Sequence, residues 1–291
     1  MSKINREYKD RLFVFIFGRE ENRKWTLSLY NAVNGTDYTD ETAIEITTMS
    51  DAVYMGMRND VSFIITEFMS LYEQQSTFNP NMPVRQLIYL GRLYDKYINV
   101  TRQNLYGNRQ IKLPVPKLVT FYNGIEDVPD RILRLSDSFS ENAELADVEV
   151  KVRLININLE NNKELLESCK PLKEYSWFVD RVRNKKYQGK MSLEDAVDCT
   201  LDEMPENFCI REFLIGNRAE VKNMCLTEYN EAETMQMFRE EGREEGREEG
   251  REEMIVDMLR RGKTVDEIAE FCNLPCEQVI AVEKKLLVSA D

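Results

Sequence analysis

Two apolar runs joined by a two-residue turn place the strongest constraint on how this chain folds. The runs extend from Val61 to Ile65 and from Phe68 to Tyr72, and both are rich in β-branched and aromatic side chains. Such runs on either side of a short turn, here Thr66-Glu67, are typical of a β-hairpin. A turn centred between residues 66 and 67 also fixes the antiparallel register, because Ile65 then lies opposite Phe68.

The same register brings two carboxylates together at the open end of the hairpin. Counting outward from the turn places Asp60 opposite Glu73, and directly opposed side chains have Cβ atoms about 5 Å apart. Gln75 shares the face of Glu73 because side chains alternate along a strand. Opposed like charges are destabilising unless a cation or a proton lies between them. We therefore expect Asp60 and Glu73 to hold a hard divalent cation, Mg²⁺ or Mn²⁺, and two solvated carboxylates are the alternative.

Six segments that extend through most of the chain carry a resemblance to a known family. They are KDRLFVFIFG from Lys9, DAVYMGMRNDVSFII from Asp51, YEQQSTFNPNMPVRQLIYLGRLY from Tyr72, VTFYNG from Val119, VEVKVRLININ from Val148 and KPLKEYSWFVDRVR from Lys170. Together they resemble the PD-(D/E)XK nuclease family transposases, also called the Rpn family of recombination-promoting nucleases.

This resemblance implies a fold, a chemistry and a set of site residues. The implied fold is a restriction-endonuclease-like α/β core, in which a mixed sheet is flanked by helices. The implied activity is Mg²⁺-dependent cleavage of DNA. The family's first acid and its Glu-x-Lys motif fall on Asp60 and on Glu73 with Gln75. Gln75 stands where the family pattern has Lys. Some nucleases of the superfamily also carry Gln at this position, but a neutral amide does not supply the positive charge of an ammonium group.

The composition excludes several other kinds of catalytic site. The chain has no histidine, which rules out Ser-His-Asp and Cys-His catalysis, a histidine general base and zinc sites that need imidazole. Its six cysteines are scattered, as expected of ordinary thiols in a reducing compartment. The chain has no apolar run of about 18 residues and no signal-peptide pattern at its start, so we expect a cytoplasmic protein without a membrane partner. Hydrolysis would therefore depend on metal-bound water.

The net charge of −13 is unfavourable for a protein that binds DNA, but this charge is unevenly distributed. The segment from Glu228 to Glu253 has eleven Glu and four Arg, a balance of −7. The segment from Asn81 to Arg131 has eight Lys and Arg and four acids, a balance of +4. A basic surface beside the metal site is therefore compatible with an acidic chain.

The basic segment begins with a helix after the Glu-x-Gln strand, which Asn81 can cap. One stripe of this helix is expected to pack on the sheet and consists of Val84, Leu87, Leu90, Gly91, Tyr94 and Ile98. A second stripe consists of Arg85, Tyr89, Arg92 and Lys96. We expect this second stripe to be either a solvated basic face or a surface that contacts DNA phosphates, since the turn after Gln75 brings the helix near the metal site.

The remaining core elements follow in the order expected of the nuclease fold. Apolar spacing predicts helices over residues 3–18 and 22–33. Strands are expected over residues 43–55, with Asp51 as a further acid or a loop carboxylate, and over residues 113–122. The second of these strands follows a crossover helix, as parallel pairing requires. A strongly alternating strand over residues 148–157 is expected at an edge of the sheet.

The C-terminal half is helical by pattern. An Arg-Glu-Glu-Gly repeat begins at Arg239 and predicts an exposed helical arm, because Glu and Arg pair at i,i+3. The tail resembles a helix-turn-helix with a Thr264-x-x-Glu267 capping box. We expect a nuclease-like core over residues 1–160, a helical extension over 161–238, the arm over 239–253 and the tail over 254–291.

The tail is expected to join copies of the chain rather than to read DNA. Its second helix begins with Cys276-Glu277-Gln278, where a DNA reader normally places basic or amide side chains. The tail is also shorter than about 40 residues, below the size at which a core usually suffices alone. Four apolar residues are therefore expected to need a partner surface, namely Ile255, Phe271, Val279 and Leu286.

Two functions are compatible with these patterns. The first is a Mg²⁺-dependent DNA endonuclease in which Asp60 and Glu73 hold the metal and Gln75 orients the attacking water. The second is a catalytically silent protein that binds DNA or serves as an oligomeric scaffold. The acid pair favours the enzyme, whereas Gln75 and the acidic balance favour the scaffold.

Overall fold

The chain divides into two compact units, with the boundary between Ala232 and Glu233. The computed structural model describes residues 12–47 and 61–288. The first unit contains the sheet and the helices that cover it, and the second contains the end of a long helix and the tail. The finer boundaries expected at residues 160, 238 and 253 stay predictions.

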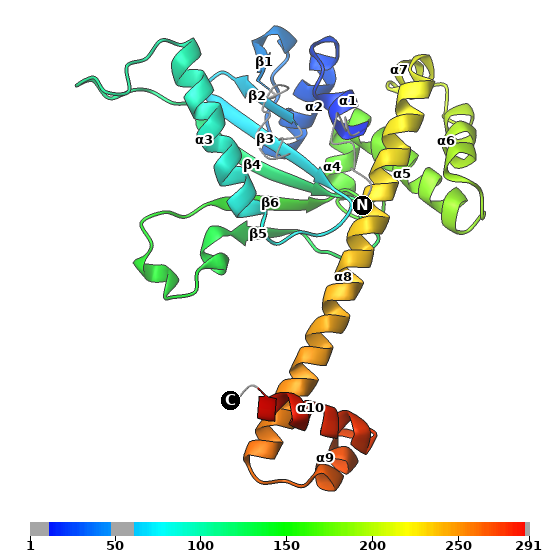
Figure 1. Cartoon of the computed structure of the whole chain (residues 1–291). Coiled ribbons are helices and arrows are strands. Elements are labelled where there is room, and N and C mark those ends of the chain that lie inside the picture. Colours follow the sequence, from blue (N-terminus) through cyan, green and yellow to red (C-terminus); the bar gives the residue numbers. More distant parts are fainter. Residues whose placement is uncertain (1–11, 48–60, 289–291) are drawn as a thin grey trace. The chain divides into compact units, whose positions relative to one another are not determined.

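The described residues of the first unit form a six-stranded mixed sheet with the order β1-β2-β3-β4-β6-β5 (Figure 1). Strands β3, β4 and β6 run parallel, and the other pairs are antiparallel. The chain therefore folds as an α/β protein with a helical C-terminal half. The strands are β1 Ile44–Ile46, β2 Val61–Ile65, β3 Phe68–Gln75, β4 Val115–Tyr122, β5 Arg131–Arg134 and β6 Lys151–Asn156.

The predicted hairpin is present with the predicted register. Ile65 lies opposite Phe68, and Val61 lies opposite Tyr72 at the open end. Thr66 takes a positive φ of 52° in the turn. The next residue outward from Val61 is Asp60, which lies outside the described residues, as does Asp51. The pairing of Asp60 with Glu73 therefore stays a prediction.

The sheet lies between two helical layers, each with its own apolar core (Figure 1). Helix α3 covers one face, and the crossover that it makes from β3 to β4 is the parallel connection expected from the sequence. The larger core on the other face is built with α1, α2 and α4 to α7. The helices are α1 Leu12–Phe17, α2 Arg23–Asn34, α3 Met82–Val100, α4 Lys163–Ser168, α5 Lys170–Tyr187, α6 Leu193–Asp202, α7 Arg211–Gly216, α8 Arg218–Arg260, α9 Val265–Cys272 and α10 Cys276–Val288.

Capping interactions define several helix ends, and the predicted Thr264–Glu267 capping box is present, whereas the Asn81 side chain makes no capping bond at the start of α3. Gly35 ends α2 in the left-handed conformation with a φ of 65°, which costs little without a Cβ atom. The Ser192 side chain accepts a hydrogen bond from the backbone N–H of Asp195 at the start of α6. Thr264 and Glu267 form the capping box of α9. None of the described helices combines the length and the apolar composition needed to cross a membrane.

One prediction about packing within the first unit is wrong, and a second is confirmed only in part. The strand over residues 148–157 is not at an edge, because β6 lies between β4 and β5. The stripe of α3 that packs on the sheet overlaps the predicted one but is rotated from it: Leu90 is buried and Val84, Leu87 and Tyr94 pack against the same core, whereas Gly91 is exposed. The buried side chains of α3 are instead Met82, Pro83, Gln86, Tyr89, Leu90 and Leu93.

The tail has a small core of its own. Ile255 and Val279 were expected to need a partner surface but are buried inside the tail with Ile268, Ala269 and Val282. Phe271, by contrast, is 72% exposed, and the side chain of Leu286 lies outside the described part of the chain. Among the expected partner-seeking residues whose side chains are described, Phe271 alone presents its side chain to solvent.

Candidate active site at the end of strand β3

Two of the predicted site residues, Glu73 and Gln75, lie at the C-terminal end of β3 on the face that α3 covers. Leu71, Glu73 and Gln75 alternate with residues that face the other core, and Leu71 packs in the core beneath α3. Glu73 is completely buried and Gln75 is 6% exposed. Burial of a charge and an amide at one strand end is costly unless both are bonded, so their partners decide what this site does.

The carboxylate of Glu73 is paired with a guanidinium from α3. Arg85 donates through Nη2 to Glu73 Oε2 at 3.2 Å, and the same nitrogen lies 3.3 Å from the hydroxyl of Tyr89. The guanidinium carbon of Arg85 also lies 5.9 Å from the centre of the Tyr89 ring, within the range of a cation–π contact. The buried carboxylate of Glu73 is thus compensated by a positive charge from α3.

Gln75 has weak partners for a buried amide. Its Nε2 donates to the sulfur of Met82 at the start of α3, and a thioether is a weak acceptor. Its Oε1 is buried and has no hydrogen-bond partner among the described residues. An unsatisfied buried acceptor costs on the order of 1–3 kcal/mol. The amide oxygen of Gln75 is therefore available as a ligand or as an acceptor for water.

A second buried amide lies beside this pair. Gln86 donates from Nε2 to the carbonyl oxygen of Val119 at 3.2 Å and to the hydroxyl of Thr120 at 3.3 Å. Thr120 is the residue of β4 that pairs with Glu73 in the parallel register. The Oε1 of Gln86 also lacks a partner within the described part of the chain. The end of β3 is thus surrounded by polar groups from three elements.

The described donors fit a hard divalent cation in chemical type. Mg²⁺ and Mn²⁺ prefer oxygen ligands, and Glu73 supplies a carboxylate while Gln75 supplies an amide oxygen. Residues 12–47 and 61–288 contain no group of three or more Cys, Asp or Glu side chains that could hold a metal by itself. Asp60 and water would therefore complete such a site, and the carboxylate of Glu73 would be shared with Arg85.

The predicted DNA-contact stripe of α3 does not lie on one exposed face. Arg85 is turned toward Glu73, and Tyr89 is only 2% exposed. Both side chains face the sheet because α3 is rotated from the predicted orientation. Arg92 is half-buried and Lys96 is exposed, so these two cations remain available to an outside partner.

The opposite face of β3 is occupied by a structural network. Gln74 donates to Asn123 at 2.7 Å, and Asn123 donates to the hydroxyl of Tyr175 at 3.1 Å. Burial raises the pKa of Tyr72 well above its usual value, which keeps this phenol neutral. Gly124 follows this network, and a Cβ atom there would lie 2.2 Å from the carbonyl oxygen of Ser76. This close approach fixes the chain just after the site.

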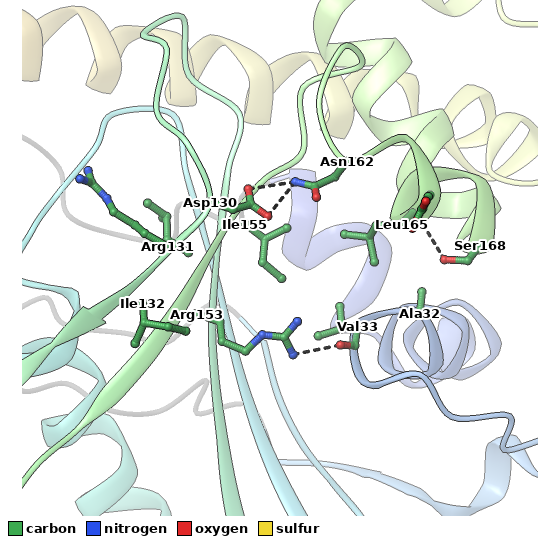
Figure 2. Close-up of a pocket in the computed structure, with 12 residues that line it drawn as sticks. Ala32, Val33, Asp130, Arg131, Ile132, Arg153, Ile155, Asn162, Leu165 and Ser168 are labelled. Atoms are coloured by element: carbon green, nitrogen blue, oxygen red, sulfur yellow. Dashed lines mark hydrogen bonds between the residues drawn. The ribbon is translucent and has the colours of Figure 1, made fainter.

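An open cavity of about 650 Å³ lies elsewhere, between β5, β6 and helices α2 and α4 (Figure 2). Three of its polar side chains already have partners in its wall. Asp130 accepts from Asn162 at 2.9 and 3.0 Å, and Arg153 donates to the carbonyl oxygen of Val33 at 2.9 Å. Neither Glu73 nor Gln75 lines this cavity. We therefore place no reaction there.

No family model, curated protein or solved structure matches the chain. The assignment of a function thus depends on the residues and geometry of the site.

Proposed function

We propose that the chain is a metal-dependent DNA endonuclease with a restriction-endonuclease-like core, of the recombination-promoting or transposase-like type. The observation that carries this proposal is the joint burial of Glu73 and Gln75 on one face of β3, with the Gln75 amide oxygen lacking a partner among the described residues. Burial of an amide oxygen without a partner costs free energy, which favours a ligand or a water at this oxygen. The parallel crossover from β3 through α3 to β4 also agrees with the proposed core.

Each site residue has a role that its chemistry permits. A Mg²⁺ or Mn²⁺ ion, when bound, lowers the pKa of its water and stabilises charge on the scissile phosphate. Asp60 and Glu73 hold this cation, and the amide oxygen of Gln75 accepts a hydrogen bond from the attacking water and orients it. Arg85 holds the Glu73 carboxylate in place through their ion pair.

A second function is supported by the same ion pair. The Arg85 guanidinium already compensates the charge of Glu73 without a metal, and no ammonium group stands at position 75. These two facts favour a catalytically silent protein that binds DNA or serves as a scaffold. In either case we propose a homo-oligomer that associates through the tail, where Phe271 is exposed.

A plasmid-relaxation assay tests the proposal. Purified full-length protein is incubated with supercoiled plasmid in Mg²⁺, in Mn²⁺ and in chelator, beside the Asp60→Asn variant and the control Asp95→Asn. The control removes an exposed carboxylate on α3. The endonuclease predicts metal-dependent nicking by the wild type and the control only. Absence of nicking by the wild type in both metals, with intact DNA binding, would favour the silent protein.

A further inference from the structure

A basic loop, residues 101–114, joins the end of α3 to β4 and extends away from the sheet (Figure 1). The thirty residues from 96 to 125 contain no Asp or Glu, although the whole chain has a net charge of −13. The same thirty residues contain five cations, which are Lys96, Arg102, Arg109, Lys112 and Lys117. The basic loop and its flanks therefore form a locally positive part of an acidic chain.

The basic loop is held in a defined shape by its own polar groups. Gln103 donates to the carbonyl oxygen of Lys112 at 3.2 Å, and the Lys112 N–H donates back to the Gln103 side chain at 3.1 Å. At the base, the Tyr94 hydroxyl donates to the carbonyl oxygen of Pro114 at 2.8 Å. These hydrogen bonds join the two ends of the loop, so its exposed side chains are attached to a backbone of defined shape.

The middle of the basic loop carries an exposed aromatic ring, with exposed cations on both sides of it in the sequence. Tyr106 is 93% exposed, and its backbone N–H donates to Asn104 Oδ1 at 3.0 Å. Arg102, Arg109 and Lys112 are exposed, and none forms an ion pair with the described residues. Exposed cations around an exposed aromatic ring are the combination that binds nucleic-acid strands, through phosphate contacts and base stacking.

We propose that the basic loop binds DNA, with its three cations on phosphates and the Tyr106 ring stacked on a base. This inference rests on the proposed function and adds a DNA contact distant from the cleavage site. Polar amides between the cations favour DNA over a lipid surface, because they hydrogen-bond base edges but lose free energy when buried in lipid. These amides belong to Gln103, Asn104, Asn108 and Gln110.

The geometry sets the length of DNA that both sites can contact. The basic loop follows the C-terminal end of α3, whereas Arg85 and Glu73 lie near its N-terminal end. The 19 residues of α3 span about 28 Å at 1.5 Å per residue, which corresponds to a duplex of roughly 8 base pairs at 3.4 Å each. Lys96 is exposed between the two ends. Shorter duplexes therefore engage one end only.

Fluorescence anisotropy of labelled DNA in chelator tests the inference without cleavage. The triple variant Arg102→Gln, Arg109→Gln and Lys112→Gln is compared with a matched control, Lys151→Gln, Lys163→Gln and Arg181→Gln, which removes three other exposed cations. With a duplex of about 20 base pairs, the loop variant should lose at least about tenfold in affinity, and its salt slope should fall by about 2.5. The control should keep both. For single strands, Tyr106→Ala should bind more weakly than Tyr106→Phe.

The outcomes separate this inference from the proposed nuclease activity. A loop variant that binds DNA with wild-type affinity and salt slope would overturn the inference, even if the wild type nicks plasmid. Loop-dependent binding by a protein that never nicks would support the inference and contradict the nuclease. Loss of self-association or of binding to anionic vesicles, with DNA binding unchanged, would also overturn it. A wild type with no affinity for DNA would reject both.

Discussion

The guanidinium of Arg85 lies 3.2 Å from the carboxylate of Glu73, which joins α3 to the end of β3. The carboxylate is fully buried, whereas the Arg85 side chain is 30% exposed. This asymmetry lets the guanidinium neutralise a charge that burial alone would disfavour, while it stays near enough to solvent to be displaced. The ion pair can therefore stabilise the site when no cation is bound. When a cation binds, one carboxylate oxygen of Glu73 can leave Arg85 and coordinate it.

Replacement of Arg85 by Met should destabilise the protein. We expect a loss of about 2 kcal/mol, less than for a wholly buried ion pair because Arg85 is partly exposed. The double variant with Glu73→Gln should recover at least about 1 kcal/mol of that loss, since it removes the carboxylate that the guanidinium compensates. Urea unfolding of the two single variants, the double variant and the control Arg92→Met measures both quantities. Strictly additive effects would show that the pair contributes nothing.

Replacement of Gln75 by Lys should retain or raise nicking activity. An ammonium group beside the scissile phosphate adds stabilisation of transition-state charge, and at this buried position it can also approach Glu73. Gln75→Met, which keeps a similar volume but no amide, should be less active than the wild type because it cannot orient water. Initial nicking rates of the three proteins decide between these effects. Loss of Mg²⁺ binding by the Lys variant, measured by calorimetry, would instead identify Gln75 as a direct ligand.

The stability of the helical layer should depend on pH through Asp198. Its pKa is lowered, first by the hydrogen bond from Lys222 on α8 and further by Arg218. A lowered folded-state pKa stabilises the protein above the unfolded value of about 4, and this contribution disappears as pH falls through the folded value. Between about pH 5 and pH 3 the wild type should therefore lose more stability than Asp198→Asn. Chemical unfolding across this range tests the difference, with Asp37→Asn as the exposed control; equal pH dependence in wild type and Asp198→Asn would contradict it.

Truncation after Phe238 should give a smaller assembly that still nicks plasmid DNA. The tail packs its own core around Ile255 and Val279 but leaves Phe271 exposed, so Phe271→Glu in the full chain should have the same effect on assembly without unfolding the tail. Light scattering coupled to size-exclusion chromatography reports the mass of each protein. Unchanged stoichiometry after truncation would remove the association role, and lost DNA affinity at unchanged stoichiometry would favour DNA binding by the tail.

The sequence predicted the parts of the fold that local pattern determines. The hairpin register followed from two apolar runs and a two-residue turn, and it was confirmed from Val61 to Tyr72. The edge strand β5 was not predicted, because Arg131–Arg134 has only two apolar residues between arginines and no lasting alternation. Without β5, the strand over residues 148–157 was expected to be the last strand of the sheet.

Only the part of the site that lies on a single strand could be predicted from the sequence. Glu73 and Gln75 share a face because they are two residues apart, which the sequence shows directly. The rotation of α3 depends instead on packing against the sheet: Gln86 is drawn inward by its bonds to Val119 and Thr120, and Arg85 and Tyr89 turn with it. A buried polar residue within the packing stripe cannot be recognised from an apolar pattern, so the sequence alone leaves Arg85 and Tyr89 on the outer face of the helix.

The nicking rates of Glu73→Gln and Glu67→Gln in Mg²⁺ test whether the buried carboxylate of β3 is a metal ligand. Both substitutions remove one negative charge from the same hairpin, but Glu67 is exposed in its turn whereas Glu73 is buried beside Arg85. Thermal melts first establish that both variants are folded. We then expect Glu67→Gln to nick at the wild-type rate and Glu73→Gln to lose at least about 100-fold, as expected for a metal ligand. Equal nicking by the two variants would contradict it.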